Sequence, residues 1–169
     1  MMLLSIIITI LSCLIQGIVS NYLGYTFDNI SVFSTLYILI ALLIVSPYFE
    51  NEKKYLIILI IFGLIVDIAY TSTPIFNTTI FILVYYFSKV FHFFLPYNLF
   101  TININNLLCV FIYHIITFLF LIIFKYDSFS IWVLIKILTH SIFMTIIYTS
   151  IIYILIKFLK EKFDLREVK

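Results

Sequence analysis

Six long apolar runs constrain this chain more than any other feature of its sequence. They lie at about 2–20, 31–47, 55–72, 77–95, 104–124 and 131–156, and polar or charged residues separate them. A bilayer core of about 30 Å is crossed by roughly 20 apolar residues in an α-helix. The runs therefore predict an all-α polytopic membrane protein, with six transmembrane helices and short loops in a single integral-membrane domain over residues 1–169.

The composition excludes several other classes of protein. Hydrophobic residues make up 64% of the chain and charged residues 11%, whereas a soluble domain has roughly 45–50% and about 25%. A net charge of +2 gives no support to nucleic-acid binding. A β-barrel is disfavoured because its strands would alternate over about 10 residues. Cys13 and Cys109 lie inside apolar runs, which predicts small packing residues rather than a disulfide or a metal pair.

The basic residues predict the orientation of the helices. If the N-terminus is cytoplasmic, the inner side receives eight Lys and Arg residues and the outer side two. This imbalance predicts that both termini are cytoplasmic. No basic residue precedes the first run and no A-x-A-like site follows it, so a retained helix is expected rather than a signal peptide. Residues 157–169 are expected to form a short charged cytoplasmic tail, which anchors the last helix or contacts anionic headgroups or a partner.

Asp67 is an ionisable residue deep within a predicted span. It follows Lys54 by 13 residues, or roughly 20 Å along a helix, and a carboxyl group at that depth usually faces other helices or a wet cavity. Lys136 enters the sixth run from the opposite side and reaches a similar depth. Either the two side chains form an ion pair, or Lys136 extends outward to the interface.

Two histidines extend this pattern into a predicted intramembrane polar cluster. His114 and His140 also fall near mid-membrane, and Lys136 and His140 share a helix face at a spacing of four residues. Together with Asp67 they would join the third, fifth and sixth spans. We interpret the cluster as a structural clamp, with a proton or substrate path as the functional alternative.

The first run carries a stripe of small residues. Ser5, Thr9, Cys13 and Gly17 recur every four residues. Small side chains at this spacing let another helix approach closely. The stripe is therefore either a packing seam inside the bundle or a docking face for a partner helix.

No motif indicates catalysis. The chain lacks H-E-x-x-H, G-x-S-x-G, a Walker loop and G-x-G-x-x-G. The loops are too short to house a catalytic constellation. We therefore expect a protein that is not an enzyme and has no cofactor and no metal site. The remaining classes are a small transporter subunit, a lipid-binding membrane protein and a membrane scaffold.

The segment GLIVDIAYTSTPIFNTTIFILVYYFSK, residues 63–89, resembles the MreD family of bacterial rod shape-determining proteins. Gly63 and Asp67 match the G-x-x-x-D segment that ends the third span of that family. Residues 71–77 match its polar turn, and Tyr85, Tyr86 and Lys89 match the aromatic and basic residues that close its fourth span. The length, the six short-looped spans and the cytoplasmic termini are also similar to those of the family.

One position departs from the family pattern. Family members usually have a glycine in the turn after the aspartate, and residues 75–77 contain none. Asn77 is expected to take its place, because asparagine tolerates left-handed backbone and caps helix starts.

The resemblance implies a non-enzymatic scaffold of the cell-elongation complex, which directs peptidoglycan synthesis and rod shape in the bacterial plasma (inner) membrane. The implied partners are MreC and, through it, the MreB filament, the RodA glycosyltransferase and a class B penicillin-binding protein. The stripe from Ser5 to Gly17 is, on its spacing alone, the candidate face for a partner's transmembrane helix. Asp67 would hold the bundle in shape.

A second family remains open. The substrate-binding S components of energy-coupling-factor vitamin transporters also have six spans and a similar size, and a small-residue first helix docks their coupling subunit. Such a protein needs an outward-facing pocket with several polar groups. The predicted outer loops, at 21–31, 71–76 and 125–130, offer few charged groups for one.

Overall fold

The structure is a computed structural model of the chain, and it describes residues 2–26, 36–49, 51–71, 75–124 and 131–163. Within these ranges all regular structure is helical, which confirms the predicted all-α class. The α-helices are α1 (Met2–Thr26), α2 (Tyr37–Val45), α3 (Glu52–Val66), α4 (Phe76–Phe94), α5 (Leu99–Ile123) and α6 (Ile131–Phe163). A 3-10 helix (Ser46–Tyr48) follows α2, and a π-helical turn (Asp67–Thr71) follows α3.

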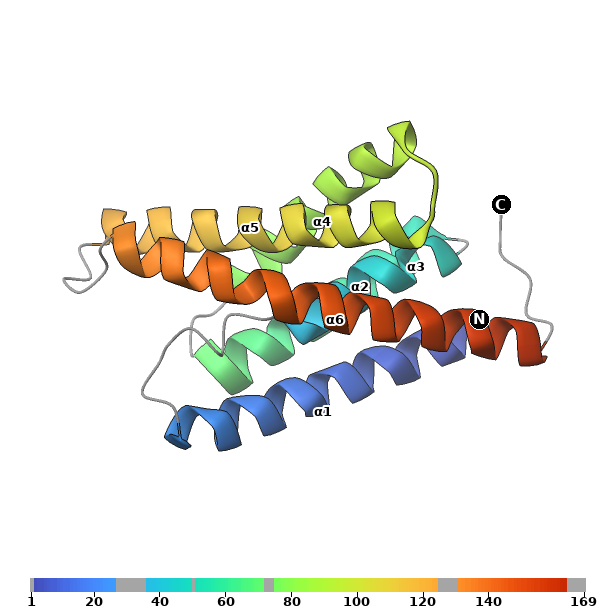
Figure 1. The fold of residues 1–169 in the computed structure, drawn as a ribbon, viewed down its shortest axis with the longest axis horizontal. Helices are drawn as coiled ribbons and strands as arrows, with labels where there is room; N and C mark the ends of the chain where they lie inside the picture. The colour runs from blue at the N-terminus through green and yellow to red at the C-terminus, as the bar shows by residue number, and fades with distance from the viewer. Residues whose placement is uncertain (1, 27–35, 50, 72–74, 125–130, 164–169) are drawn as a thin grey trace.

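Successive helices run back and forth along the long axis of the molecule (Figure 1). α1 therefore begins and α6 ends at the same end of the bundle, which we call the terminal end. The starts of α3 and α5 and the finish of α4 also point toward this end, while the starts of α4 and α6 lie toward the opposite end.

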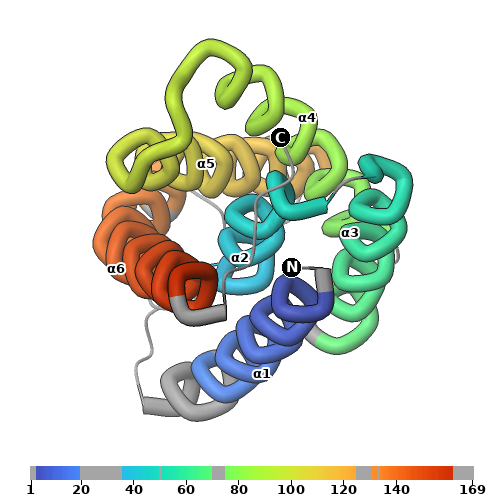
Figure 2. Tube along the Cα trace, turned by 90° about the vertical axis from the view of Figure 1, so that its right-hand side faces the viewer, coloured from blue at the N-terminus to red at the C-terminus, as the bar shows by residue number. Residues whose placement is uncertain are grey.

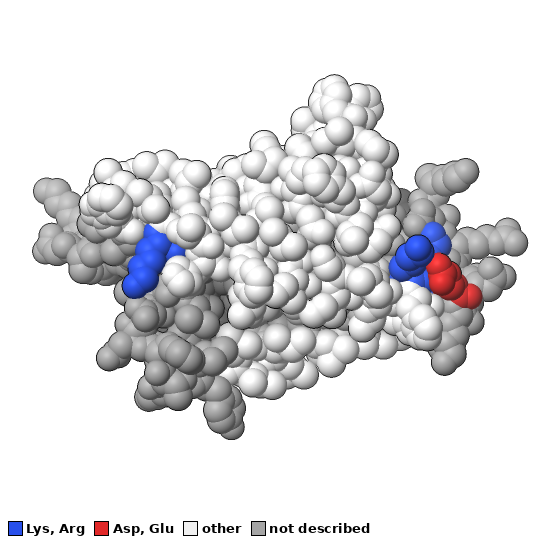
Figure 3. Space-filling model, viewed as in Figure 1, with Lys and Arg blue, Asp and Glu red and all other residues white. Residues whose placement is uncertain are grey.

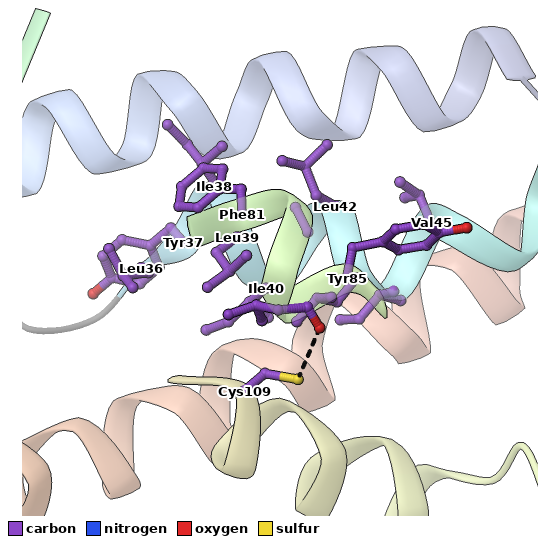
Figure 4. Packing of buried hydrophobic residues seen from close by; sticks show 14 of the residues in the cluster. Leu36, Tyr37, Ile38, Leu39, Ile40, Leu42, Val45, Phe81, Tyr85 and Cys109 are labelled. Atoms are coloured by element: carbon purple, nitrogen blue, oxygen red, sulfur yellow. Dashed lines mark hydrogen bonds between the residues drawn. The ribbon is translucent and has the colours of Figure 1, made fainter. Parts of the chain in front are cut away.

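α2 lies at the centre of the bundle, with the other five helices around it (Figure 2). Every residue from Leu36 to Val45 is buried. This segment, LYILIALLIV, is apolar on all sides, and such a helix is stable only where it is covered all round. Phe81 and Tyr85 of α4 and Cys109 of α5 pack beside it (Figure 4).

Local side chains explain where several helices begin and end. Asn51 accepts a hydrogen bond of 2.9 Å from the backbone N–H of Lys53 at the start of α3, and Asn98 accepts one of 2.9 Å from Thr101 at the start of α5. These are the side-chain caps expected of asparagine at a helix start. Pro47 lies in the 3-10 helix that closes α2, where its missing N–H ends the α-helical pattern.

Several helices differ in extent from the predicted spans. α1 continues to Thr26 and α6 to Phe163, so both are longer than predicted, and α5 begins at Leu99 rather than 104. Asn103 lies just before the run predicted from residue 104, whereas Asn105 and Asn106 lie within it, and all three side chains contact neighbouring helices. Residues 31–35 of the second predicted span lie outside the described residues.

Among the described residues, two helices are long and apolar enough to cross a membrane: α5, and the part of α6 from Leu134 to Glu161. Two shorter apolar helical segments are Leu3–Val19 and Tyr37–Tyr48. On the face drawn in Figure 3 the charged side chains of the described residues lie toward the two ends of the long axis, and the surface between them carries none. The two long helices, α5 and α6, give the chain generic membrane-helix character.

Candidate functional site

Asp67 is buried where α3 passes into the π-helical turn, with 1% of its surface exposed. One carboxylate oxygen accepts hydrogen bonds from the backbone N–H (2.8 Å) and the side-chain amide (3.0 Å) of Asn77. The other accepts from the backbone N–H (3.1 Å) and the hydroxyl (2.7 Å) of Thr78. An ionised carboxylate has about four acceptor positions, and these four donors match that number.

These hydrogen bonds make Asp67 the cap of α4. The first N–H groups of a helix have no partner within the helix, and the N-cap residue Ile75 provides no side-chain cap. Asp67 supplies the missing acceptors from the preceding helix. A negative charge at this position is also favoured by the positive end of the helix dipole. The carboxylate therefore couples the end of α3 to the beginning of α4.

Gly63 lets the two helices approach closely enough for this cap. A Cβ atom at Gly63 would lie 2.7 Å from the Cα of Thr78 and 2.8 Å from its hydroxyl oxygen. Real Cβ atoms do not approach other atoms this closely, so any other residue would push α4 away from α3. Gly63 lies one helical turn before Asp67, and both act on the same residue of α4.

Asn77 extends the network to α5. Its side-chain oxygen accepts a short hydrogen bond from the hydroxyl of Tyr113. The Tyr113 ring lies 6.1 Å from that of Phe81, between ring centres. We call Gly63, Asp67, Asn77, Thr78 and Tyr113 the Asp67 junction, which joins α3, α4 and α5.

The left-handed backbone falls at Ile75 and not at Asn77. Ile75 has a φ of 67° and precedes α4, whereas Asn77 lies within the first turn of that helix. The expectation that Asn77 replaces the family's glycine through left-handed backbone is therefore corrected. Its side chain instead links Asp67 to Tyr113. Ile75 is the residue that turns the chain into α4, and a β-branched residue is strained in this conformation.

The helix that carries Asp67 is separated from the helix that carries Lys136 and His140. α3 and α6 lie on opposite sides of α2 (Figure 2). Lys136 and His140 are exposed on α6, which packs against α2 and α5. His114 is half-buried on α5, with its ring 5.5 Å from that of Tyr113 between ring centres. Depth alone suggested the pairing of Asp67 with Lys136, and the order of the helices around α2 separates these residues.

The stripe on α1 faces the inside of the bundle at its first half. Ser5 and Thr9 are buried, Cys13 and Gly17 are half-buried, and α1 packs mainly on α2. Gln16, beside the stripe, accepts a hydrogen bond of 3.2 Å from the backbone N–H of Ile38 in α2. Of the two interpretations of the stripe, the internal seam is the one that this packing favours, so the face offered to a partner has to be sought elsewhere.

α1 also contacts α6, and the sequence did not predict this contact. The hydroxyl of Tyr148 on α6 donates a hydrogen bond of 2.7 Å to the hydroxyl of Ser12. The ring of Tyr148 also meets that of Tyr37 edge to face, at 4.7 Å between ring centres. Serine next to a small-residue stripe was the available signal for Ser12, but nothing in the sequence pointed to a partner on α6.

A second buried polar group, which we call the asparagine layer, was also missed. Its centre is Asn103, Asn105 and Asn106 on α5. Their side-chain amides donate to the hydroxyls of Ser150 (3.3 Å), Ser88 (2.8 Å) and Thr149 (3.2 Å), respectively. The layer therefore ties α5 to α4 and α6. The segment I-N-I-N-N at residues 102–106 was the sequence signal for this layer. Side-chain amides at membrane depth form hydrogen bonds with neighbouring helices.

These two polar sites have a structural rather than a reactive chemistry. Their groups are amides, hydroxyls and one carboxylate that caps a helix. Among the residues that the structure describes, no three His, Cys, Asp or Glu side chains are grouped so that they could hold a metal ion. Cys13 and Cys109 form no disulfide with each other. What the sites can do is fix the relative positions of four helices.

The chain matches no protein-family model, no curated protein and no solved structure.

Proposed function

We propose that the chain is a six-span scaffold of the plasma membrane with both termini in the cytoplasm. Two features support this topology: the alternating course of the helices (Figure 1), and the bias of lysines toward the terminal end. Lysines occur in the first turn of α3 and near the ends of α4 and α6, whereas Lys136 lies near the start of α6, at the opposite end. Basic residues concentrate on the cytoplasmic side of membrane proteins.

The observation that carries the scaffold proposal is the use of Asp67. A carboxyl group that serves a transport path has to exchange protons or ligands with a wet cavity. Asp67 is instead buried, and its two oxygens accept four hydrogen bonds from the start of α4. A rigid bundle with its one intramembrane acid in a helix cap suits a protein that presents a fixed surface to others.

The resemblance to the MreD family supplies the cellular process. Gly63, Asp67 and Asn77, on which that resemblance was based, belong to one hydrogen-bonded junction. A structural reason for the motif supports the comparison with the family, since the motif would be needed to build the bundle. We therefore propose a role in the bacterial cell-elongation complex, with MreC as the direct partner.

The outer face of α1 is the candidate docking surface for the single transmembrane helix of MreC. Leu3, Ile7, Ile10 and Leu14 follow a four-three-four spacing and are 72%, 46%, 46% and 59% exposed. Alternating spacings of three and four place side chains in one seam that another helix can pack against. α1 packs mainly on α2, and the described helices leave this seam exposed.

Photo-crosslinking in rod-shaped cells tests the proposal. A photoreactive amino acid replaces Leu14 in one variant and Leu119 of α5 in a control variant. The two leucines are similarly exposed, at 59% and 52%. We expect a crosslink to MreC from position 14 and none from position 119, and we expect rods to become round when the protein is depleted.

Two results would overturn the proposal. One is the absence of any crosslink to MreC from position 14 while the cells keep their shape on depletion. The other is a vitamin that co-purifies tightly with the protein, together with crosslinks to an energy-coupling ATPase complex. That second result would identify a transporter S component instead.

A further inference from the structure

The link between α4 and α5 carries exposed aromatic side chains. Phe93 and Phe94 at the end of α4 are 84% and 75% exposed, and Phe100 in the first turn of α5 is 73% exposed. The last turns of α4 rise away from the rest of the bundle on the side toward the terminal end (Figures 1 and 2). We call these three phenylalanines the aromatic lobe. Aromatic rings of membrane proteins gather at the boundary between hydrocarbon and water.

Lys89 connects this lobe to the lysines at the start of α3. Lys89 and Phe93 are four residues apart on α4 and therefore share one face of the helix. The ammonium group of Lys89 is 2.8 Å from a carboxylate oxygen of Glu52, in the first turn of α3. Lys53 and Lys54 follow Glu52 and are exposed. The ion pair thus joins the lobe to two further exposed ammonium groups.

The charge of this corner favours an anion. Its three lysines outnumber the acids Glu50 and Glu52 in the sequence, and Glu52 is engaged by Lys89. Lys157 and Lys160 of α6 outnumber Glu161 at the same end. Lysines close to an anionic membrane surface attract it by about 1 kcal/mol each.

We propose that this corner binds the headgroup of an anionic phospholipid, with the aromatic lobe inserted beside its acyl chains. Lys53 and Lys54 contact the phosphate, and Phe93 and Phe94 fill the space just below the headgroups. The site goes beyond the scaffold function and does not depend on any protein partner. It requires only that this end of the bundle lies at a membrane interface.

Tryptophan fluorescence in defined vesicles tests this site. Trp132 is the one tryptophan of the chain, so a W132F/F93W variant reports on the lobe alone. The vesicles contain equal amounts of phosphatidylglycerol and phosphatidylcholine, with bromine on the acyl chains of either one or the other. We expect quenching to report at least a threefold local preference for phosphatidylglycerol over phosphatidylcholine. One lysine near the surface is expected to favour an anionic lipid roughly fivefold, so the expected preference lies within that range.

Variants and salt test whether Lys53 and Lys54 cause this lipid preference. The preference should fall toward unity in a K53Q/K54Q background and at about 0.5 M salt, where exposed charges are screened. It should persist in a K136Q background. The native Trp132, which is 79% exposed near the start of α6, should show no preference. An F100W reporter provides a second probe of the lobe if F93W folds poorly.

Equal quenching by the two brominated lipids at both reporter positions would overturn the proposal. So would a preference that survives K53Q/K54Q. Because no partner protein is present, either result leaves the scaffold proposal unaffected, and a failure of the crosslinking experiment would leave this site unaffected.

Discussion

The Asp67 junction and the asparagine layer are both buried polar sites, but they differ in how fully their atoms are paired. At the junction both oxygens of the carboxylate accept two hydrogen bonds each. In and beside the layer, the side-chain oxygens of Asn103, Asn106 and Thr145 have no partner within the described part of the chain. A buried charge that lacks partners costs far more than a buried amide or hydroxyl. The charged site therefore needs a complete set of donors, whereas the neutral layer tolerates gaps.

The largest expected effect comes from replacing the charge at the junction. D67N keeps the shape of the side chain but removes the ionised acceptor and turns an amide toward two donors. We expect a loss of about 3 kcal/mol or more in the free energy of unfolding, because charge-assisted bonds are lost and buried donors are left unpaired. Steric trapping in bicelles measures this quantity. K136M is the control, with an expected change within about 0.5 kcal/mol. Equal losses in the two variants would refute the cap.

Close packing at the junction should give the next largest effect. G63A places a methyl group against the backbone of Thr78, and such overpacking costs about 1–3 kcal/mol. G17A on the half-buried part of α1 is the matched glycine control, where alanine gains from its higher helix propensity. Thermal midpoints in detergent would rank the two variants. A G63A protein as stable as G17A would show that α3 and α4 do not need this contact.

The asparagine layer predicts a contrast between two threonines one turn apart on α6. T149V removes the acceptor of the Asn106 amide and should cost about 0.6–1 kcal/mol, in the range of hydrogen bonds between membrane helices. T145V removes a buried hydroxyl that has no partner among the residues that the structure describes, and it should be neutral or stabilising. The same unfolding assay compares the two directly, and the reverse order would mean that the polar layer is assigned incorrectly.

The smallest expected effect is a gain at the turn before α4. I75G relieves a β-branched residue at a φ of 67°. The strain of about 1–2 kcal/mol exceeds the entropic cost of glycine, so we expect a stabilisation of about 0.5 kcal/mol. N77G serves as the opposite control, because Asn77 is helical and bonded to Asp67. Destabilisation by I75G would contradict the strained turn.

The sequence was sufficient to predict an all-helical fold and the importance of Asp67, but not the partners of Asp67. Depth in the bilayer follows from counting residues along a helix. The angular position of a side chain and the neighbours of its helix do not. Lys136 therefore matched Asp67 in depth, while the actual donors were Asn77 and Thr78, just across the turn. Residues 77–79, N-T-T, stand at the start of an apolar run. This pattern indicated a helix start that needs a cap, and it was overlooked.

The stripe on α1 and the asparagine layer both show that a sequence pattern does not identify the neighbouring helix. The four-residue spacing of Ser5 and Thr9 predicted either an internal seam or a docking face, and the spacing could not show that α1 packs on α2. Of the three asparagines of α5, Asn103 fell just outside the predicted fifth span, and Asn105 and Asn106 fell inside it with no predicted partner. Their donors are satisfied by hydroxyls of α4 and α6, and a sequence without those positions in space cannot reveal this.

Asp67 acts through α4 and not through α6. A pair of double-mutant cycles tests this role of Asp67 most directly, with free energies of unfolding measured for D67N, T78V, K136M and the two double variants. We predict a coupling of about 1 kcal/mol or more between Asp67 and Thr78, because residues in one hydrogen-bond network are not additive. We predict additivity between Asp67 and Lys136 within about 0.5 kcal/mol. Strong coupling to Lys136 together with additivity at Thr78 would contradict the account.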